Sequence, residues 1–216
     1  MINTVLIGFG YWGPNIARNI FRCGGLNLYG ICDIDERQLE RARSIYGDRV
    51  RYFSDYNEAI GDASVEACAI ALRNEAGQNA ARAVLSSGRH LFMEKPMATS
   101  LDDALALKEL SQKHGAVLQV DHILVYNPFI RRIKEIYDSG GLGELIAFES
   151  SRANLGPHIK KDMNAMWDLA VHDIAVLDFL CGGQEPLKVS CIGEKRYGDQ
   201  EIVTYLTMKY EGFIAM

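Results

Sequence analysis

A carboxylate and an imidazole stand four residues apart in the stretch Trp167-Asp168-Leu169-Ala170-Val171-His172. On a helix, Asp168 and His172 share one face, so the carboxylate can orient the ring and favour its protonated form as the ring accepts a proton. This arrangement predicts a general base with its partner. The alternative is structural, with Asp168 capping a helix and His172 packing against its neighbours.

A lysine in Glu94-Lys95-Pro96 is the second candidate for chemistry. The tripeptide follows an expected strand over 90–93, and ligands of open α/β sheets bind outside the carboxyl ends of the strands. Pro96 fixes its own φ and restricts Lys95 to extended conformations, which would aim the ammonium at a defined point. The alternative is an exposed lysine in a turn. Glu94 either hydrogen-bonds a cofactor or holds Lys95, and the sequence leaves both open.

A glycine-rich turn near the N-terminus could bind an anion. Val5-Leu6-Ile7 is expected to form a strand that enters Gly8-Phe9-Gly10-Tyr11-Trp12-Gly13, and a helix follows. Gly8 permits the tight turn, Gly10 lets the backbone approach a pyrophosphate, and Gly13 lets the helix pack close. The pyrophosphate would lie at the helix N-terminus, where unpaired N–H groups and the helix dipole favour an anion. The alternative is a turn without a ligand.

An acidic residue at the end of the second expected strand favours one cofactor. The strand over 28–32 ends at Asp33, twenty residues beyond Gly13. A carboxylate there can accept both hydroxyls of an adenosine ribose, and it repels a 2′-phosphate. Strand, turn, helix and distal acid therefore predict an NAD site and favour NAD over NADP.

Strands and helices alternate over the first 121 residues. Further strands are expected over 50–53, 65–72, 90–93 and 117–120, with helices between them. This order predicts an α/β fold, a Rossmann domain with a doubly wound parallel sheet and right-handed crossovers.

The pattern changes near residue 123. Helices are expected over 128–139 and 168–181, and extended segments over 144–152, 187–196 and 201–210. Long neighbouring strands joined by a short turn predict a mostly antiparallel sheet and hence an α+β second lobe. We therefore expect two domains, 1–121 for NAD and 122–216 for substrate and oligomerisation, the second truncated because its sheet looks incomplete.

Composition excludes several classes of function. The net charge of −5 argues against nucleic acid as a partner, and no apolar run approaches the length of a membrane span. The first strand follows Met1 almost at once, so we expect no signal peptide and a cytoplasmic protein. Five scattered cysteines without a C-x-x-C spacing predict reduced thiols, and we expect no metal site.

The sequence resembles the Gfo/Idh/MocA family, the glucose-fructose oxidoreductase and inositol dehydrogenase group. The resemblance covers essentially the whole chain and rests on the glycine motif, Asp33, Glu94-Lys95-Pro96, and the pair Asp168 and His172. Some segments look most like sugar-nucleotide dehydrogenases, which oxidise C3 of a UDP-hexose derivative in surface-polysaccharide pathways. These segments are Gly10-Tyr11-Trp12-Gly13-Pro14-Asn15, Tyr126-Asn127-Pro128, Asn154-Leu155-Gly156 and Trp167-Asp168-Leu169.

The resemblance implies a role for each matching residue. Lys95 would hydrogen-bond the reacting hydroxyl, His172 would take its proton with Asp168 as partner, and the carbon would pass a hydride to NAD. The cofactor would be bound by the turn from Gly8 to Gly13, Asp33, Glu94 and His122, although His122 is equally plausible as a structural residue. The expected substrate contacts are Lys95, Tyr126, Arg152, Asn154 and Lys160.

The basic segment with Arg152 and Lys160 could contact a nucleotide diphosphate or a uronate carboxylate, and the alternative is a solvated loop. One segment departs from the family: Leu72-Arg73-Asn74-Glu75-Ala76-Gly77 stands where relatives carry a Thr-Pro pair and a histidine. The chain is also shorter than its relatives, so we expect a homo-oligomer that covers the second-lobe sheet.

The leading hypothesis is an NAD-dependent sugar or nucleotide-sugar dehydrogenase. The alternatives are a noncatalytic dinucleotide- or sugar-binding regulator and an inactive short form on the same fold.

Overall fold

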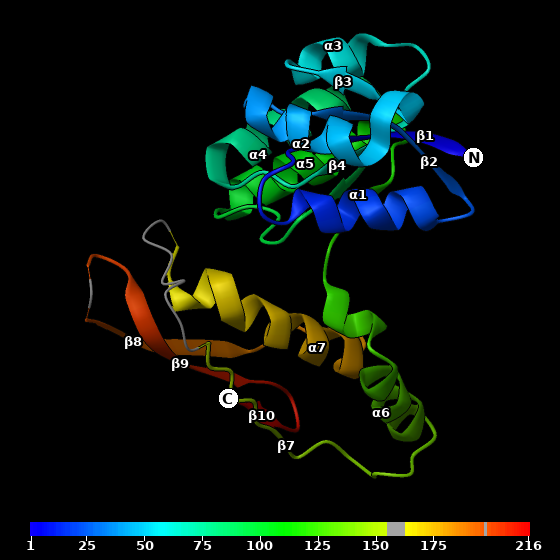
Figure 1. Ribbon diagram of the computed structural model, residues 1–216. Coiled ribbons are helices and arrows are strands. Elements are labelled where there is room, and N and C mark those ends of the chain that lie inside the picture. Colours follow the sequence, from blue (N-terminus) through cyan, green and yellow to red (C-terminus); the bar gives the residue numbers. More distant parts are fainter. Residues whose placement is uncertain (155–162, 197) are drawn as a thin grey trace. The chain divides into compact units, whose positions relative to one another are not determined.

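The computed structural model describes residues 1–154, 163–196 and 198–216 (Figure 1). The chain divides into two compact units, Met1–Asp121 and His122–Met216. Each unit is described by itself below.

The first unit is built on a parallel sheet. Its strands are β1 (Ile2–Ile7), β2 (Leu26–Cys32), β3 (Arg51–Phe53), β4 (Ala67–Ile70), β5 (His90–Met93) and β6 (Leu118–Val120). The strand order is β3-β2-β1-β4-β5-β6, and every neighbouring pair is parallel. The direction of winding reverses between β1 and β4, which is the point where ligands bind in doubly wound folds. The predicted Rossmann fold is confirmed.

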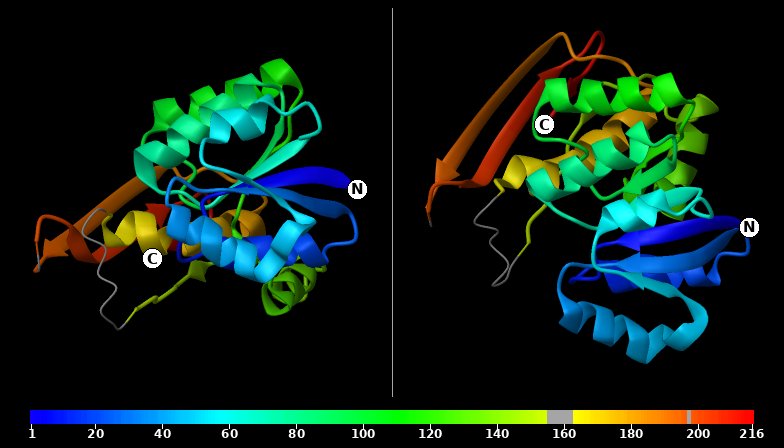
Figure 2. Two further views of the ribbon diagram at one scale, coloured as in Figure 1. Left: turned by 45° about the horizontal axis from the view of Figure 1, so that its top comes forward. Right: turned by 90° about the horizontal axis from the view of Figure 1, so that it is seen from above.

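Helices cover both faces of this sheet, as the left view of Figure 2 shows. Side chains of α1 (Gly13–Arg22) and α2 (Glu36–Tyr46) form one buried cluster with the sheet. Side chains of α3 (Tyr56–Gly61), α4 (Asn74–Ser86) and α5 (Leu101–His114) form another. The short turn η1 (Gly47–Arg49) follows α2.

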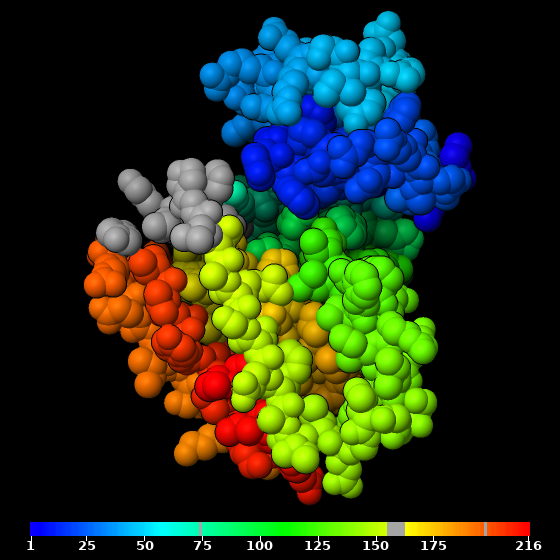
Figure 3. Space-filling view, turned by 60° about the horizontal axis from the view of Figure 1, so that its bottom comes forward, coloured from blue at the N-terminus to red at the C-terminus, as the bar shows by residue number. Residues whose placement is uncertain are grey.

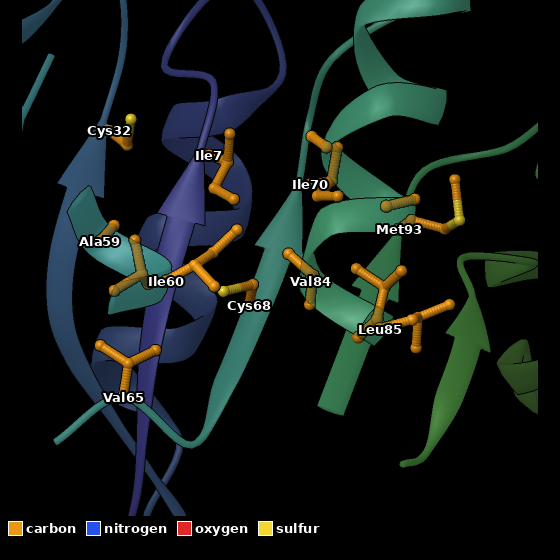
Figure 4. Packing of buried hydrophobic residues seen from close by; sticks show 14 of the residues in the cluster. Ile7, Cys32, Ala59, Ile60, Val65, Cys68, Ile70, Val84, Leu85 and Met93 are labelled. Atoms are coloured by element: carbon orange, nitrogen blue, oxygen red, sulfur yellow. The ribbon is translucent and has the colours of Figure 1, made fainter. Parts of the chain in front are cut away.

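Alternation along β1 divides its side chains between these two clusters. Leu6 packs with α1 and α2, whereas Val5 and Ile7 pack with the helices of the opposite face. Figure 4 shows Ile7 on this second side, with Val84 and Leu85 of α4 in the same cluster. Burial of one such aliphatic side chain contributes about 1.5–3 kcal/mol to the free energy that stabilises the fold. Both faces of the sheet therefore hold the turn after β1 in place.

The second unit combines helices with a mixed sheet. Its elements are η2 (Ile123–Tyr126), α6 (Pro128–Asp138), β7 (Ala147–Phe148), the π-helical turn η3 (Met166–Ala170), α7 (Val171–Cys181), β8 (Lys188–Lys195), β9 (Glu201–Lys209) and β10 (Ile214–Ala215). The sheet order is β7-β10-β9-β8, with β7 and β10 parallel and the other pairs antiparallel. Figure 3 shows the C-terminal residues, in red, beside the yellow-green segment that contains β7.

One face of this second sheet packs on a helix. Leu177 of α7 is buried with Met208, Tyr210, Phe213 and Ala215. In the expected extended segment over 144–152, Ala147–Phe148 forms strand β7, and backbone hydrogen bonds to 214–216 extend this pairing from Ile146 to Ser150. None of the described helices is both long and apolar enough to cross a membrane.

Candidate functional site

The glycine turn after β1 is packed tightly at two of its three glycines. Gly8 has a φ of +96°, and a Cβ there would lie 2.9 Å from the Ala71 carbonyl oxygen. A Cβ on Gly13 would lie 2.2 Å from the Gly8 carbonyl oxygen, so α1 can begin this close to the strand only at a glycine. At Gly10 a Cβ would meet nothing within 4 Å. The space beside Gly10 is therefore free for a ligand, as the motif predicts.

The N-terminus of α1 is also suited to an anion. Trp12 is the N-cap residue, and its side chain makes no capping hydrogen bond to the helix. The first N–H groups of the helix are therefore left without a side-chain acceptor, and Pro14 in the first turn has no N–H to satisfy. Together with the open space at Gly10, this end of α1 fits the pyrophosphate of a dinucleotide.

Asp33 lies against the glycine turn. One carboxylate oxygen accepts the Phe9 N–H at 2.7 Å and the other accepts the Asp35 N–H at 2.9 Å. These bonds fix the carboxylate at the end of β2, beside the turn after β1. An ionised carboxylate offers about four lone-pair sites, so Asp33 keeps capacity for two ribose hydroxyls. Its position fits the adenosine half of NAD.

Replacing Asp33 by alanine is expected to weaken NAD binding about tenfold or more, because both ribose hydroxyls and the Phe9 N–H lose their acceptor. The preference for NAD over NADP should fall as well, since the repulsion of a 2′-phosphate is removed. Calorimetric titration with both cofactors measures the two effects. Asp35→Ala is the matched control, because it removes a neighbouring carboxylate that caps α2. Unchanged affinities in the Asp33 variant would contradict the assignment.

Glu94 and Lys95 lie directly after β5, at the same edge of the sheet as the glycine turn. The Glu94 carboxyl is hydrogen-bonded to the side chains of Asp121 and Trp12. Burial first, and then the neighbouring Asp121, raise the pKa of Glu94 to about 7, although Lys95 and Trp12 oppose the rise. Sequence reasoning missed Asp121. The signal was its place directly after β6, one strand away from Glu94.

The segment after Lys95 is held by a side chain from α4. A cis peptide bond joins Lys95 to Pro96, and the Gln78 side-chain amide donates to the Met97 carbonyl. Gln78 lies next to Gly77, where a Cβ would come within 3.1 Å of the Leu72 carbonyl oxygen. Gly77 thus lets the first turn of α4 pack closely on Leu72, at the start of the segment that departs from the family pattern.

Asp168 and His172 lie on the same continuous helical segment in the second unit, but its first turn is π-helical. Asn164 begins this segment by accepting the Trp167 N–H at 3.2 Å. The Val171 N–H donates to the Met166 carbonyl five residues back, the bond of a π turn. Asp168 therefore lies in the π turn and His172 in the first turn of α7. Such turns are frequent at functional sites.

Arg152 is held by the residue that follows His172. Its guanidinium donates to both carboxylate oxygens of Asp173, at 2.8 and 2.9 Å, and Ser150 adds a bond at 2.8 Å. Burial alone would raise the pKa of Asp173, but the bonds from Arg152 and Ser150 outweigh it and hold that pKa below its usual value. Arg152 thus anchors α7 beside His172, an arrangement that the sequence did not reveal.

Three further predicted residues, His122, Tyr126 and Asn154, belong to the second unit. His122 follows Asp121 at the start of the second unit, before η2. Tyr126 is half-exposed, with the Arg131 guanidinium 5.0 Å from its ring centre. Asn154 is exposed, and Lys160 lies outside the described residues. Within the described part of the chain, no group of three histidine, cysteine or acidic residues could hold a metal ion.

The two units match two models of one family. Residues 2–122 match the oxidoreductase family with the NAD-binding Rossmann fold of the Gfo/Idh/MocA proteins, and residues 130–216 match the C-terminal domain of the same family. Inositol 2-dehydrogenase of Salmonella typhimurium is 27% identical over 179 residues, which cover 81% of this chain and 53% of that protein. The chain therefore spans about half the length of the curated relatives that it matches.

Solved structures share the fold. The myo-inositol 2-dehydrogenase of Lactobacillus plantarum has a TM-score of 0.89 at 19% identity, covering 99% of this chain and 68% of that one. An oxidoreductase from Agrobacterium radiobacter in complex with NAD⁺, L-tartaric acid and magnesium has a TM-score of 0.85 at 20% identity, covering 99% and 65%. This chain belongs to the Gfo/Idh/MocA oxidoreductase family, and its first unit is the NAD-binding Rossmann domain of that family.

Proposed function

We propose that this protein is an NAD-dependent dehydrogenase that oxidises a hydroxyl-bearing carbon of a sugar, in particular a nucleotide sugar. The observation that carries the proposal is Lys95, which follows Glu94 at the carboxyl end of β5, at the same sheet edge as the glycine turn of an NAD-binding domain. A domain that only binds a dinucleotide has no need of a lysine at that place.

The reaction divides between the two units. NAD supplies the chemistry of hydride acceptance when it is bound. The Lys95 ammonium donates a hydrogen bond to the substrate hydroxyl and stabilises alkoxide character as its proton leaves. His172 accepts that proton, and Asp168 stabilises the resulting imidazolium. Lys95 belongs to the first unit and the other two to the second, so their meeting at one substrate is part of this proposal.

The substrate class follows from motifs and from relatives. The segments Tyr126-Asn127-Pro128 and Asn154-Leu155-Gly156 are similar to those of sugar-nucleotide dehydrogenases, which supports a role in making sugars of surface polysaccharides. Asn127 also has a structural role, because its side chain caps α6 by accepting the Phe129 N–H. Relatives named as inositol 2-dehydrogenases support a polyhydroxylated ring as substrate. A screen of UDP-sugars and inositols, with NADH absorbance as the readout of turnover, tests both substrate classes.

Replacing His172 by asparagine is expected to slow oxidation by about 10²–10⁴-fold, because the proton acceptor is lost. In the unaltered protein, kcat/KM should fall toward low pH as His172 becomes protonated and cannot accept a proton. The variant should lack this acid-side inflection. Rates measured across pH test the prediction, with the exposed His114→Asn as control. An unaltered profile in the His172 variant would assign the proton to another base.

A noncatalytic dinucleotide- or sugar-binding role is the second candidate. The observation that favours it is the segment from Leu72 to Gly77, which lacks the Thr-Pro pair and histidine of catalytic relatives near the nicotinamide half of the site. Tight NAD binding without turnover of any sugar in the screen would support this candidate.

We further propose that the protein forms a homo-oligomer through the sheet of the second unit. Ile192 and Tyr205 are cross-strand partners in β8 and β9 and are 73% and 69% exposed. With Val203 they lie on the face opposite Met208, which packs with α7. An apolar group of this kind on an open sheet face is typical of an interface. Sedimentation of the full chain measures the state of assembly.

A further inference from the structure

Two acidic side chains lie together at the carboxyl edge of the first sheet. β5 and β6 are parallel neighbours, and their pairing continues one residue beyond the strands, because the Asp121 N–H donates to the Met93 carbonyl at 2.8 Å. Glu94 and Asp121 are therefore neighbours across the two strands, and their carboxyl groups are hydrogen-bonded to each other. A hydrogen bond between two carboxyls needs a proton on one of them, so the pair shares one.

One oxygen of the pair has no hydrogen-bond partner among the described residues. It is the buried Oε1 atom of Glu94, whose carboxyl also receives the Trp12 indole. The charged groups that act on Glu94 are Asp121 and Lys95, and His122 follows Asp121 in the chain. Trp12 belongs to the glycine turn, so the pair is joined directly to the loop that binds the cofactor.

The order of strands places the pair on the nicotinamide half of the site. Asp33 marks the adenosine half at the end of β2, and the glycine turn after β1 marks the pyrophosphate. A dinucleotide that starts over β2 and crosses at β1 extends toward β4, β5 and β6. The ring that changes charge in the reaction therefore lies on the side of Glu94 and Asp121.

We propose that the Glu94–Asp121 pair is a charge-selective element of the cofactor site, which binds the cationic nicotinamide of NAD⁺ in preference to the neutral dihydronicotinamide of NADH. With one shared proton the pair carries one negative charge, and with none it carries two. Loss of the shared proton therefore strengthens the attraction for NAD⁺ and leaves the ring of NADH unaffected. The proposal rests on cofactor binding and not on the sugar substrate or on the role of His172.

The sign of the pH dependence follows from the raised pKa of Glu94, about 7. Below that value the pair holds its proton, and above it the second charge develops. The ratio of Kd for NADH to Kd for NAD⁺ is therefore expected to rise by about fivefold to tenfold between about pH 6 and about pH 8.5 at fixed ionic strength. Calorimetric titration of the full chain with each cofactor measures this ratio and requires no variant.

Two amide variants test the origin of the rise. In Glu94→Gln the carboxyl with the raised pKa is absent, so the ratio should be the same at both pH values. In Asp121→Asn burial still raises the pKa of Glu94, but the contribution of Asp121 is lost, so the rise in the ratio should shift to lower pH. His114→Asn, at the exposed end of α5, is the control for loss of an imidazole from the first unit, and it should keep the full rise.

ADP-ribose lacks the nicotinamide but keeps the rest of the dinucleotide. It therefore separates the attraction of the pair for the nicotinamide from any effect of pH on the binding of the remaining groups. Its affinity should not follow the titration of the pair. A constant ratio in the unaltered protein would overturn the proposal, as would a rise of full size in Glu94→Gln. Absence of turnover with every sugar, with the pH-dependent ratio intact, would overturn the proposed dehydrogenase function alone.

Discussion

Replacing Lys95 by alanine is expected to abolish turnover while NAD binding remains nearly unchanged. Lys95 is assigned to the substrate hydroxyl, so its loss removes stabilisation that exists mainly in the transition state. A fall in kcat of about 10³-fold corresponds to about 4 kcal/mol. The cofactor contacts of the glycine turn and Asp33 do not involve this side chain, so the Kd for NAD⁺ should change by less than about threefold.

The measurement pairs turnover, followed by NADH absorbance, with calorimetric titration of NAD⁺. Lys108→Ala, on the exposed side of α5, is the control for loss of one positive charge from the first unit. Lys95 also lowers the pKa of Glu94, so its removal should let the carboxyl pair keep its shared proton to higher pH. Substantial turnover in the Lys95 variant would overturn the assigned role.

The first unit was predictable because its signals are local. The glycine spacing, the acid after β2 and the alternation of strands with helices predicted the Rossmann fold, the family and NAD, and all three are confirmed. The ends of individual strands were predicted less accurately than their order. The apolar run over 65–72 predicted a longer strand than β4, because Val65 is buried in a turn and not in the ladder. Hydrophobicity reports burial, and only hydrogen-bond pairing defines a strand.

Contacts between distant residues were not predictable from the sequence. Asp121 becomes informative only once β5 and β6 are known to be neighbours, since nothing in its own segment refers to Glu94. Arg152 was interpreted as part of a basic loop, but its guanidinium is bound by Asp173 on α7. A single sequence gives the sign of each charge but not its partner. The predicted contact of Arg152 with the substrate stays a prediction, and so do the predicted roles of the other site residues.

The helix with Asp168 and His172 shows what residue spacing cannot predict about helix geometry. The spacing of four residues correctly predicted helical structure, but it could not reveal the π turn of η3. A π turn adds one residue to a turn without altering composition, so hydrophobic periodicity barely changes. The orientation of Asp168 relative to His172 therefore depends on packing around Met166–Ala170, which the sequence pattern does not encode.

Alanine at two glycines of the turn after β1 is expected to have opposite effects. Gly10→Ala should leave the melting temperature unchanged, because its Cβ meets nothing within 4 Å, but NAD affinity should fall by about tenfold or more, since the methyl group occupies the space for pyrophosphate. Gly13→Ala should cost at least about 2 kcal/mol of unfolding free energy, because its Cβ would lie 2.2 Å from the Gly8 carbonyl oxygen.

Thermal unfolding with and without NAD separates the two results. Gly13→Ala should lower the melting temperature by about 5 °C or more without ligand, despite the better helix propensity of alanine. Gly10→Ala should instead lose the stabilisation that saturating NAD provides. Gly61→Ala is the matched control, because a Cβ there meets nothing within 4 Å and Gly61 ends α3, away from the turn. Normal NAD stabilisation of Gly10→Ala would mean that the pyrophosphate does not approach this backbone, and the glycine turn would then serve packing alone.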